Sequence, residues 1–368
     1  MKRVRIVCVA VAVFMLLGLV LGSACAGAKG EQGPQGEQGL QGPQGLQGEK
    51  GDKGDTGAQG AQGIQGLQGI QGVPGPAGLG YSPKQIALLR WYEAIQAGDN
   101  ITAGDQPMAL AFDGSDIWVA NYMSSYLTRI KASSGETVQQ PALGTYVRAL
   151  AFDGTRMWGA NFMNGTVSAI RLSDGSILGP YTGPTVPMAL AFDGANIWVA
   201  GGTGTLMKLR ASDGQNLGTY NVGNDLNGLA FDGTRIWVSD FANDKVMRVR
   251  PSDGFVEANY TVGDSPTALV FDGTYVWSAN INGGSVTRIR VSDGLMQSYD
   301  AGAYPYGLAF DGRNIWVANY LGETVTKLRA SDGSPVGTYT IGGSTVGMAF
   351  DGANVWVTNM DDDTVVKL

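Results

Sequence analysis

One short pattern recurs seven times along the last two thirds of this 368-residue chain, and it limits what the chain can fold into. The pattern is Phe-Asp-Gly, two variable residues, an apolar residue and Trp. Its Phe stands at positions 112, 152, 192, 231, 271, 310 and 350, so successive copies are 39 or 40 residues apart. A fixed period of this length indicates a repeat architecture, in which each unit buries its apolar surface against its neighbours.

Each copy holds four short segments with the composition of β-strands. In the sixth copy they are residues 305–310, 315–319, 324–329 and 336–342, and Asp-Gly pairs follow the first and the third segment. Asp-Gly between alternating apolar segments is a strong hairpin signal. Four antiparallel strands in each of seven units predict an all-β fold, a seven-bladed β-propeller that spans residues 100–368.

The two ends of this region predict how the ring closes. The seventh copy stops at Leu368, after its third strand, while residues 100–104 precede the first copy and resemble the end of a fourth strand. We therefore expect residues 100–104 to complete the last blade. The chain's two cysteines, Cys8 and Cys25, lie far upstream. Hydrogen bonds and packing must therefore hold the ring shut without a disulfide.

Glycine occupies every third position without interruption from Gly30 to Gly78. Only glycine fits the crowded axis of a collagen triple helix, so this period has a steric cause. It predicts a collagen-like stalk over residues 26–80 and, because a triple helix needs three chains, a homotrimer. A flexible linker rich in Gly and Gln is the alternative. The segment resembles the collagen-like surface proteins of bacteria.

The first residues have the pattern of an export signal. Lys2, Arg3 and Arg5 precede an apolar run over residues 6–21, and small residues follow it. Residues 1–25 therefore predict a signal peptide or a lipoprotein signal. Three fates remain open: acylation of Cys25, cleavage after residue 26 or 28, and retention of the run as an anchor. Each predicts an extracytoplasmic protein, cell-surface or secreted, that meets the membrane only through an N-terminal anchor.

Residues 81–99 predict a short α-helical neck. Ser82-Pro83 is typical of a helix start. The apolar residues Leu88, Trp91 and Ile95 follow with a spacing that suits packing between three copies of the chain. Packing of this helix against the propeller remains equally open.

Composition excludes several classes of function. Histidine is absent, which excludes Ser-His-Asp sites and a histidine base. The net charge of −7 argues against nucleic acid as a partner. Twelve of the 32 acidic residues are Asp in Asp-Gly pairs, so we attribute much of the negative charge to turns rather than to an acidic binding face. We expect no cofactor and no metal. Asp361, Asp362 and Asp363 lack the spacing of a calcium loop and suit a solvated loop better.

The repeats resemble the YVTN/NHL-type propeller repeats of secreted bacterial proteins over residues 100–368. The resemblance rests on strands such as Trp316-Val317-Ala318-Asn319 and on third strands of the form Thr-Val-x-Lys/Arg. Streptogramin B lyases are similar in repeat style, but their chemistry uses a histidine, which this chain lacks. The resemblance therefore implies the fold and does not carry that activity over.

Ligands of propellers usually meet the face that carries the second-to-third loops and the connections between blades. The sequence places aromatic side chains and one evident positive charge on this face. Our ligand-binding candidates are Tyr122, Phe162, Phe241, Tyr320, Arg148 and Tyr306. Aromatic rims with scattered polar groups suit protein or glycan partners. The alternative is that these side chains only fill the mouth of the central channel.

The opposite face carries the Asp-Gly turns and a basic residue at the end of most third strands. The basic residues are Lys131, Arg171, Arg210, Arg250, Arg290 and Arg329. We expect them to pair with nearby turn carboxylates. A ring that binds polyanions is the alternative.

The sequence thus favours a non-enzymatic binding or scaffold protein, a surface-displayed propeller on a collagen-like stalk. The alternative is an extracellular lyase or hydrolase that acts on peptides or sugars through carboxylates. Asp240 favours that alternative weakly, because it is an acid where most blades have Asn.

Overall fold

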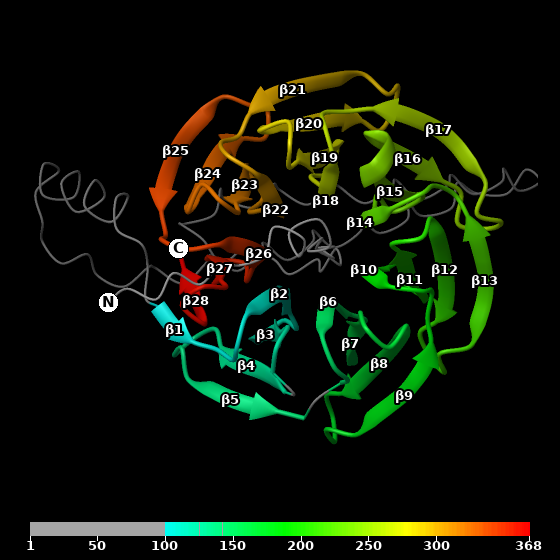
Figure 1. Cartoon of the computed structure of the whole chain (residues 1–368), viewed down its shortest axis with the longest axis vertical. Helices are drawn as coiled ribbons and strands as arrows, with labels where there is room; N and C mark the ends of the chain where they lie inside the picture. The colour runs from blue at the N-terminus through cyan, green and yellow to red at the C-terminus, as the bar shows by residue number, and fades with distance from the viewer. Residues whose placement is uncertain (1–99, 125, 142) are drawn as a thin grey trace, which may run out of the picture. The chain divides into compact units, whose positions relative to one another are not determined.

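The structure is a computed structural model that describes residues 100–124, 126–141 and 143–368. The predicted signal (1–25), stalk (26–80) and helical neck (81–99) lie outside these residues. The described chain forms seven four-stranded antiparallel sheets that follow one another around a ring (Figure 1). The predicted seven-bladed β-propeller is confirmed. No helix in this part of the chain is long and apolar enough to cross a membrane.

Each blade is a meander whose first strand lies nearest the centre of the ring and whose fourth lies on its circumference (Figure 1). The first strands of blades 1 to 7 are β2 (Pro107–Phe112), β6 (Val147–Phe152), β10 (Pro187–Phe192), β14 (Leu226–Phe231), β18 (Pro266–Phe271), β22 (Pro305–Phe310) and β26 (Thr345–Phe350). The second strands are β3 (Asp116–Asn121), β7 (Arg156–Asn161), β11 (Asn196–Gly201), β15 (Ile236–Asp240), β19 (Tyr275–Asn280), β23 (Asn314–Asn319) and β27 (Val355–Asn359).

The outer strands complete the same order. The third strands are β4 (Leu127–Lys131), β8 (Thr166–Arg171), β12 (Thr205–Arg210), β16 (Lys245–Val249), β20 (Ser285–Arg290), β24 (Thr324–Arg329) and β28 (Thr364–Lys367). The fourth strands are β5 (Thr137–Gln140), β9 (Ile177–Thr182), β13 (Asn216–Asn221), β17 (Val256–Thr261), β21 (Met296–Asp300), β25 (Pro335–Thr340) and, in blade 7, β1 (Asn100–Thr102). A short 3₁₀ turn, η1 (Phe241–Asn243), follows β15. The strands predicted in the sixth copy agree with β22 to β25 within two residues.

The ring closes by pairing the two ends of the described chain. β1 lies antiparallel to β28, with Asn100 opposite Val366 and Thr102 opposite Thr364 (Figure 1). The backbone N–H of Ala103 extends this pairing by donating to the carbonyl of Asp363 at 2.9 Å. The predicted closure is confirmed, although the strand ends at Thr102 rather than at residue 104.

The recurring Asp-Gly-x-x-apolar-Trp pattern forms one hydrogen-bonded unit in all seven blades. In each, one carboxylate oxygen of the Asp accepts two backbone N–H groups of the turn, and the other accepts the indole N–H of the Trp at 2.7–2.8 Å. The Gly after the Asp has a positive φ, 91° at Gly312, which favours glycine. The seven Trp side chains are at most 6% exposed.

Joints between neighbouring blades use the same Trp rings. In six blades a Lys or Arg of the third strand lies over the Trp of its own blade, 4.3–6.0 Å from the ring centroid. Several of these cations also donate to a turn carbonyl of the next blade, as Lys208 does to Pro251 at 2.9 Å and Lys367 to Ala132 at 2.8 Å. Within the described residues blade 7 has no third-to-fourth turn, because β1 supplies its fourth strand. Lys327 of blade 6 makes no such bond within the described residues.

The first strands approach one another closely at the centre of the ring. A Cβ added at Gly307 in β22 would lie 1.9 Å from the carbonyl oxygen of Val346 in β26, and one at Gly228 in β14 would lie 2.1 Å from that of Thr267 in β18. These two glycines are therefore required by backbone packing between blades.

We predict that Asp311→Asn lowers the free energy of unfolding by about 1–3 kcal/mol, because one amide N–H must then face a donor in the turn or on Trp316. Burial raises the pKa of Asp311, but hydrogen bonds from Asn314 and Trp316 outweigh it and leave the pKa below its ordinary value. The stability that this carboxylate contributes is therefore complete above the ordinary carboxyl range and is lost as the pH falls through the lowered pKa. Urea unfolding followed by Trp fluorescence measures both effects.

Asp332→Asn is the matched control, because Asp332 occupies the other Asp-Gly turn of blade 6 and its ion pair with Arg329 is exposed. An equal loss of stability in both variants would contradict the role given to the Asp–Trp bond.

Removal of β1 tests the closure. A propeller fragment that begins at residue 107 should unfold at a lower temperature than one that begins at residue 100, and it should aggregate, because the edge of β28 is then unpaired. Differential scanning calorimetry and light scattering measure the two effects. Identical melting of the two fragments would show that β1 does not hold the ring.

Candidate functional site

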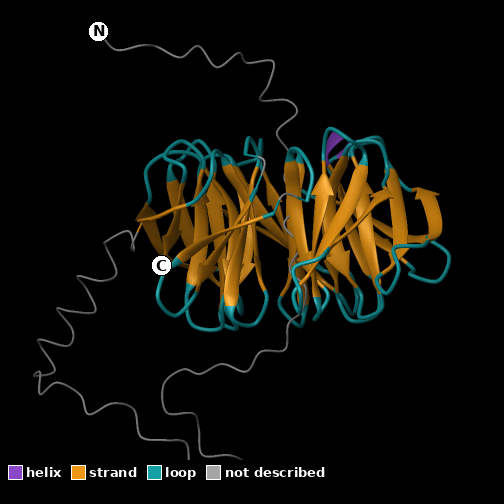
Figure 2. Cartoon of the chain, turned by 90° about the horizontal axis from the view of Figure 1, so that it is seen from below, coloured by secondary structure: helices purple, strands orange, loops and turns teal. Residues whose placement is uncertain are grey.

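Loops gather at the two ends of the strands, so the ring has two faces (Figure 2). The loop face carries the second-to-third loops and the connections between blades. The turn face carries the first-to-second and third-to-fourth turns. η1 lies on the loop face (Figure 2). All six sequence-predicted ligand-binding candidates lie at the loop-face end of their strands or in the loops that follow.

The second residue of each first strand contributes to a plug at the centre of the ring. Contacts between distant blades show that these side chains converge: Met108 of blade 1 shares one apolar cluster with Tyr306 of blade 6 and Val346 of blade 7. None of the seven is more than 3% exposed, and they are Met108, Arg148, Met188, Asn227, Thr267, Tyr306 and Val346. Arg148 and Tyr306 are therefore buried in the channel. Our expectation that Arg148 is the evident charge of an exposed rim is wrong.

Arg148 is the most unusual side chain of this plug. Its Nη2 donates to the hydroxyl of Tyr306 at 3.2 Å, a bond between blades 2 and 6, and its guanidinium lies 5.2 Å from the ring centroid of Phe162. Its Nε and Nη1 are buried and have no hydrogen-bond partner in the described part of the chain. Burial lowers the pKa of Arg148, although Tyr306, Tyr122 and Asp225 act in the opposite direction. Such a desolvated cation costs stability.

The four aromatic candidates lie half-buried around the mouth of the channel. The Tyr122 ring lies 5.1 Å from Tyr146 and 6.1 Å from Phe162, and the Tyr320 ring lies 5.9 Å from Tyr306. Phe241 begins η1. The structure thus brings Tyr122, Phe162, Arg148, Tyr306 and Tyr320 together and leaves Phe241 in a separate loop. Their role in ligand binding stays a prediction.

The large apolar side chains that the loop face exposes are different residues, which the sequence reasoning missed. Met123, Met163 and Leu321 are 50%, 63% and 55% exposed, and Tyr304 is 43% exposed. The first three stand one residue after Tyr122, Phe162 and Tyr320. The sequence held a signal for them. The chain turns after each second strand, so the residue that follows Tyr122, Phe162 or Tyr320 no longer faces the channel.

Blade 4 brings two carboxylates to the loop face. Asp240 is almost fully buried and accepts the backbone N–H groups of Asn224 and Asp225 at 3.1 and 3.3 Å. Burial raises the pKa of Asp225, and the negative charge of Asp240 raises it further, while Arg148 lowers it. An acid with a raised pKa beside a second carboxylate is able to donate a proton.

The three consecutive acids after β27 hold loops. Asp361 accepts the backbone N–H and the hydroxyl of Ser344 at 2.9 Å, and Asp363 accepts the backbone N–H of Gln106 at 2.9 Å. Asp362 accepts the side-chain amide of Asn359 at 2.9 Å. Within residues 100–368, apart from the two omitted positions, no group of three or more acids is placed to hold a metal ion.

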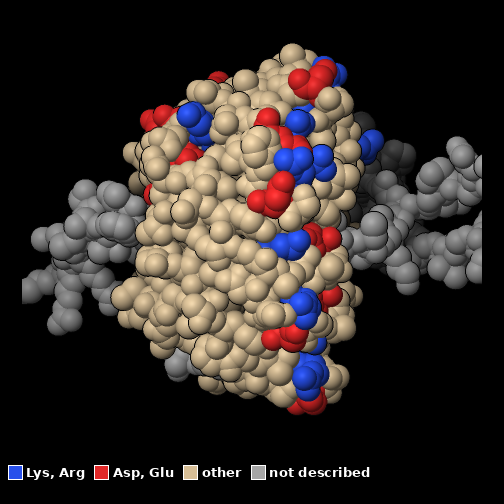
Figure 3. Space-filling model, turned by 90° about the vertical axis from the view of Figure 1, so that its right-hand side faces the viewer, with Lys and Arg blue, Asp and Glu red and all other residues tan. Residues whose placement is uncertain are grey.

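The turn face uses its charges in ion pairs. Five third-strand arginines pair with the Asp three residues later at 2.9–3.2 Å: Arg171, Arg210, Arg250, Arg290 and Arg329. Lys131 pairs with Glu136 at 2.7 Å. On the side of the ring drawn in Figure 3, acidic and basic side chains follow one edge together. The predicted pairing with turn carboxylates is confirmed.

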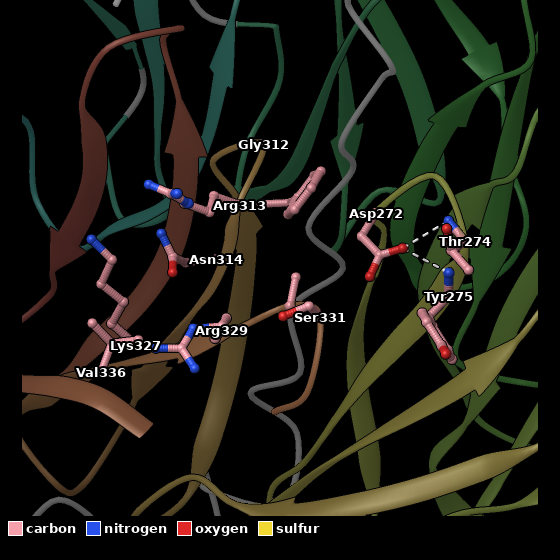
Figure 4. A pocket seen from close by; sticks show the side chains of 12 residues that line it. Asp272, Thr274, Tyr275, Gly312, Arg313, Asn314, Lys327, Arg329, Ser331 and Val336 are labelled. Atoms are coloured by element: carbon pink, nitrogen blue, oxygen red, sulfur yellow. Dashed lines mark hydrogen bonds between the residues drawn. The ribbon is translucent and has the colours of Figure 1, made fainter. Parts of the chain in front are cut away.

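A hollow of about 710 Å³ opens on the turn face between blades 5 and 6 (Figure 4). Arg313, Lys327 and Arg329 line one side of it and Asp272 the other. Arg329 is paired with Asp332, and Asp272 accepts the backbone N–H groups of Thr274 and Tyr275 at 2.8 and 2.7 Å. Burial lowers the pKa of Lys327. Arg329 and Asp272 in this hollow are therefore already engaged in contacts that stabilise blades 5 and 6.

Comparison with known proteins gives one match for the glycine-repeat segment and others for the propeller. The Collagen triple helix repeat (20 copies) family matches residues 24–83. Hydrazine synthase of Kuenenia stuttgartiensis is similar in structure, with a TM-score of 0.63 and 15% identity over 72% of this chain and 95% of that one. The WD40 beta propeller domain of Doa1 has a TM-score of 0.62 and 14% identity over 74% of this chain and 96% of that domain. At this identity the likeness shows the fold alone. No curated protein matches the chain in sequence.

Replacement of the buried arginine tests what the plug does for the fold. Met108 and Met188 occupy the same position in the two neighbouring blades, so Arg148→Met fits the local packing. We expect it to raise the free energy of unfolding by roughly 1–4 kcal/mol, because it removes a buried charge with unpartnered N–H groups. Denaturant titration measures the change. Arg148→Lys, which keeps the buried charge, should not stabilise, and a loss of stability in Arg148→Met would show that the arginine is structural.

Proposed function

We propose that this chain is a binding or scaffold protein displayed outside the cytoplasm, in which the collagen-like stalk presents the propeller and the loop face binds protein or glycan partners. One observation carries the proposal: a collagen-repeat match is joined to a closed propeller whose loop face exposes Met123, Met163, Tyr304 and Leu321. Because the ring is already closed, these apolar side chains are not needed to pack the blades. Their exposure makes them available to contact a partner at the loop face.

The N-terminal region supports the proposed location. Residues 1–25 have the basic, apolar and small-residue order of an export signal. Acylation of Cys25 would hold the protein at a membrane surface, whereas cleavage after residue 26 or 28 would release it. We also infer that the repeats belong to the YVTN/NHL type, because strands such as Trp316-Val317-Ala318-Asn319 follow that pattern.

The stalk makes the proposed protein a homotrimer. The collagen triple helix repeat match implies three chains around one axis, so three propellers would be presented together. Three linked modules raise the overall affinity for a repetitive surface without any new contact. This favours a partner that is itself repetitive, such as a glycan coat or an array of proteins.

The proposal includes no catalysis. An extracellular lyase or hydrolase with carboxylate chemistry is the second candidate, favoured by the raised pKa of Asp225 beside Asp240. The two candidates differ in outcome, because an enzyme would alter the peptide or sugar that it meets, whereas a binding protein would retain it unchanged.

The test is a screen of the full chain against immobilised glycans and peptides. We expect the protein to run at three times the mass of one chain in light scattering and to retain a subset of these ligands. Met123→Ser/Met163→Ser/Leu321→Ser should weaken retention at least tenfold, because buried apolar anchors dominate binding energy. Gly54→Ser should weaken it through loss of the trimer.

The chain offers matched controls. Leu217 lies near the start of β13, and Phe255 and Leu295 lie in third-to-fourth turns of the turn face. They are 41%, 57% and 59% exposed, so their triple Ser variant makes the same kind of change away from the loop face. Gln59→Ser changes the stalk without touching its glycines. Retention that falls equally in both triple variants would overturn the assignment of the loop face.

A further inference from the structure

The net charge of the described chain lies entirely on one face. The described residues hold 25 acidic and 17 basic residues. Fifteen of each lie on the turn face, in the turns or on the adjoining parts of the strands, and ten acidic and two basic residues lie at the loop face. Our expectation that turn residues account for the acidity is wrong: the turn Asp residues are balanced by bases, and the excess acid is on the loop face.

The two bases at the loop face do not neutralise the negative charge of its ten acids. Arg148 is buried in the plug, and Lys245 lies opposite Asp240 at the start of β16. Blades 4 and 5 still contribute Asp225, Asp244 and Asp264. Exposed like charges on one surface sum to a potential that attracts oppositely charged partners and raises their association rate.

One sector of the loop face, formed by blades 6, 7 and 1, holds acids without any base. It carries Glu323, Asp361, Asp362, Asp363 and Asp105, and Asp300 lies at its border, at the end of β21 in blade 5. The sector is continuous, because the backbone N–H of Gln106 in the connection into blade 1 donates to Asp363 of blade 7. Asp105, Asp300 and Glu323 are exposed and make no side-chain hydrogen bond or ion pair in the described part of the chain. The blades do not use these three carboxylates.

Apolar side chains stand among these acids. Tyr304 and Leu321 of blade 6 are exposed close to Glu323, and Met123 of blade 1 is exposed beside Asp105, to whose carbonyl its N–H donates at 3.2 Å. Met and Tyr are enriched in protein interfaces. An acidic surface with apolar anchors is complementary to a basic polypeptide with apolar side chains, and less so to a neutral glycan.

A buried acceptor without a donor lies in blade 4, at the loop-face end of its first strand. Asn227, which is fully buried at the centre of the ring, donates its amide N–H to the backbone and side-chain oxygens of Asp225. Because both partners are acceptors, the orientation of the amide is settled, and its Oδ1 has no partner among the described residues. An unsatisfied oxygen next to a carboxylate suits a cationic N–H donor.

We propose that the loop face binds basic polypeptide, with the sector of blades 6, 7 and 1 as the main contact. Lysine or arginine side chains of the partner would meet Asp105, Asp300 and Glu323, and its apolar side chains would cover Met123, Tyr304 and Leu321. The inference rests on the proposed binding function of the loop face and names the partner class. A second copy of the propeller does not fit, because its turn face is neutral and its loop face is acidic.

The test uses the full chain and a fluorescein-labelled peptide of four Lys-Leu-Ser triplets, followed by anisotropy. We expect saturable binding that weakens as salt rises. Asp105→Asn/Asp300→Asn/Glu323→Gln should weaken it about tenfold, since each exposed charge pair contributes modestly. The control Ala195→Lys/Gln215→Lys/Ala353→Lys raises the net charge by the same amount on the turn face and should leave binding unchanged.

Other outcomes separate the inference from the proposal on which it rests. Equal weakening in both triple variants would overturn the assigned sector. Complete competition by spermine, or equal binding of a peptide with Ser in place of Leu, would overturn recognition of a polypeptide. Retention of neutral glycans without any binding of the basic peptide would overturn this inference and leave the proposed function standing, whereas no retention of any ligand would overturn both.

Discussion

The hydrogen bond from each marker Trp to its turn Asp is the interaction on which the rest of this structure depends. The carboxylate holds its own turn with one oxygen and the indole with the other, as Asp311 does with Trp316 at 2.8 Å. The bond therefore fixes the position of a large ring between blades. A third-strand cation lies over that ring in six blades. In five blades a fourth-strand Tyr also packs on it, with ring centroids 5.3–6.1 Å apart. One acid in a turn thus organises the joint between two blades.

This use of charge explains why the two faces differ. Turn-face acids and bases meet within a few residues, as in Arg171 and Asp174, where hydrogen bonds from Ser176 and Arg171 lower the pKa of Asp174 to about 2. Several loop-face acids also hold connections, as Asp240 and Asp363 do by accepting backbone N–H groups, but these bonds need no basic partner. The acids of the loop face are therefore not matched by bases, unlike those of the turns. The ion pairs of the turns and the surface that we propose for partner binding thus lie at opposite ends of the same strands.

The positions that vary between blades are as informative as those that repeat. The Asp and Trp of the marker are the same in all seven units, whereas the second residue of the first strand is Met, Arg, Met, Asn, Thr, Tyr and Val in turn. A blade can be built around any of these side chains, so the plug that they form is not dictated by the repeat. Arg148 and Asn227 leave buried polar atoms without partners there. Departures of this kind from a well-satisfied core are expected at functional positions.

Local chemistry determined much of this protein from sequence alone. Strand alternation, Asp-Gly turns and the spacing of Trp are short-range signals. They predicted the seven blades, the strand bounds of the sixth blade within two residues and the pairing of third-strand bases such as Arg171 with turn carboxylates. The missing fourth strand of the last unit even predicted that residues near Asn100 would pair near Val366. These inferences needed only neighbours in the chain or a count of units. The ring itself followed from them.

The tertiary structure decided what lies at the centre and what lies outside. Arg148 and Tyr306 are 158 residues apart, and their contact exists only because blades 2 and 6 face each other across the channel. Repeat periodicity gives the same position in every blade but not which side chains meet across the axis. For the same reason the sequence placed the exposed apolar groups at Tyr122 and Tyr320 rather than at Met123 and Leu321. The sequence also did not reveal that the loop face is acidic. Which acids lie near bases, and which are left unpaired on one surface, is decided only when the ring has formed.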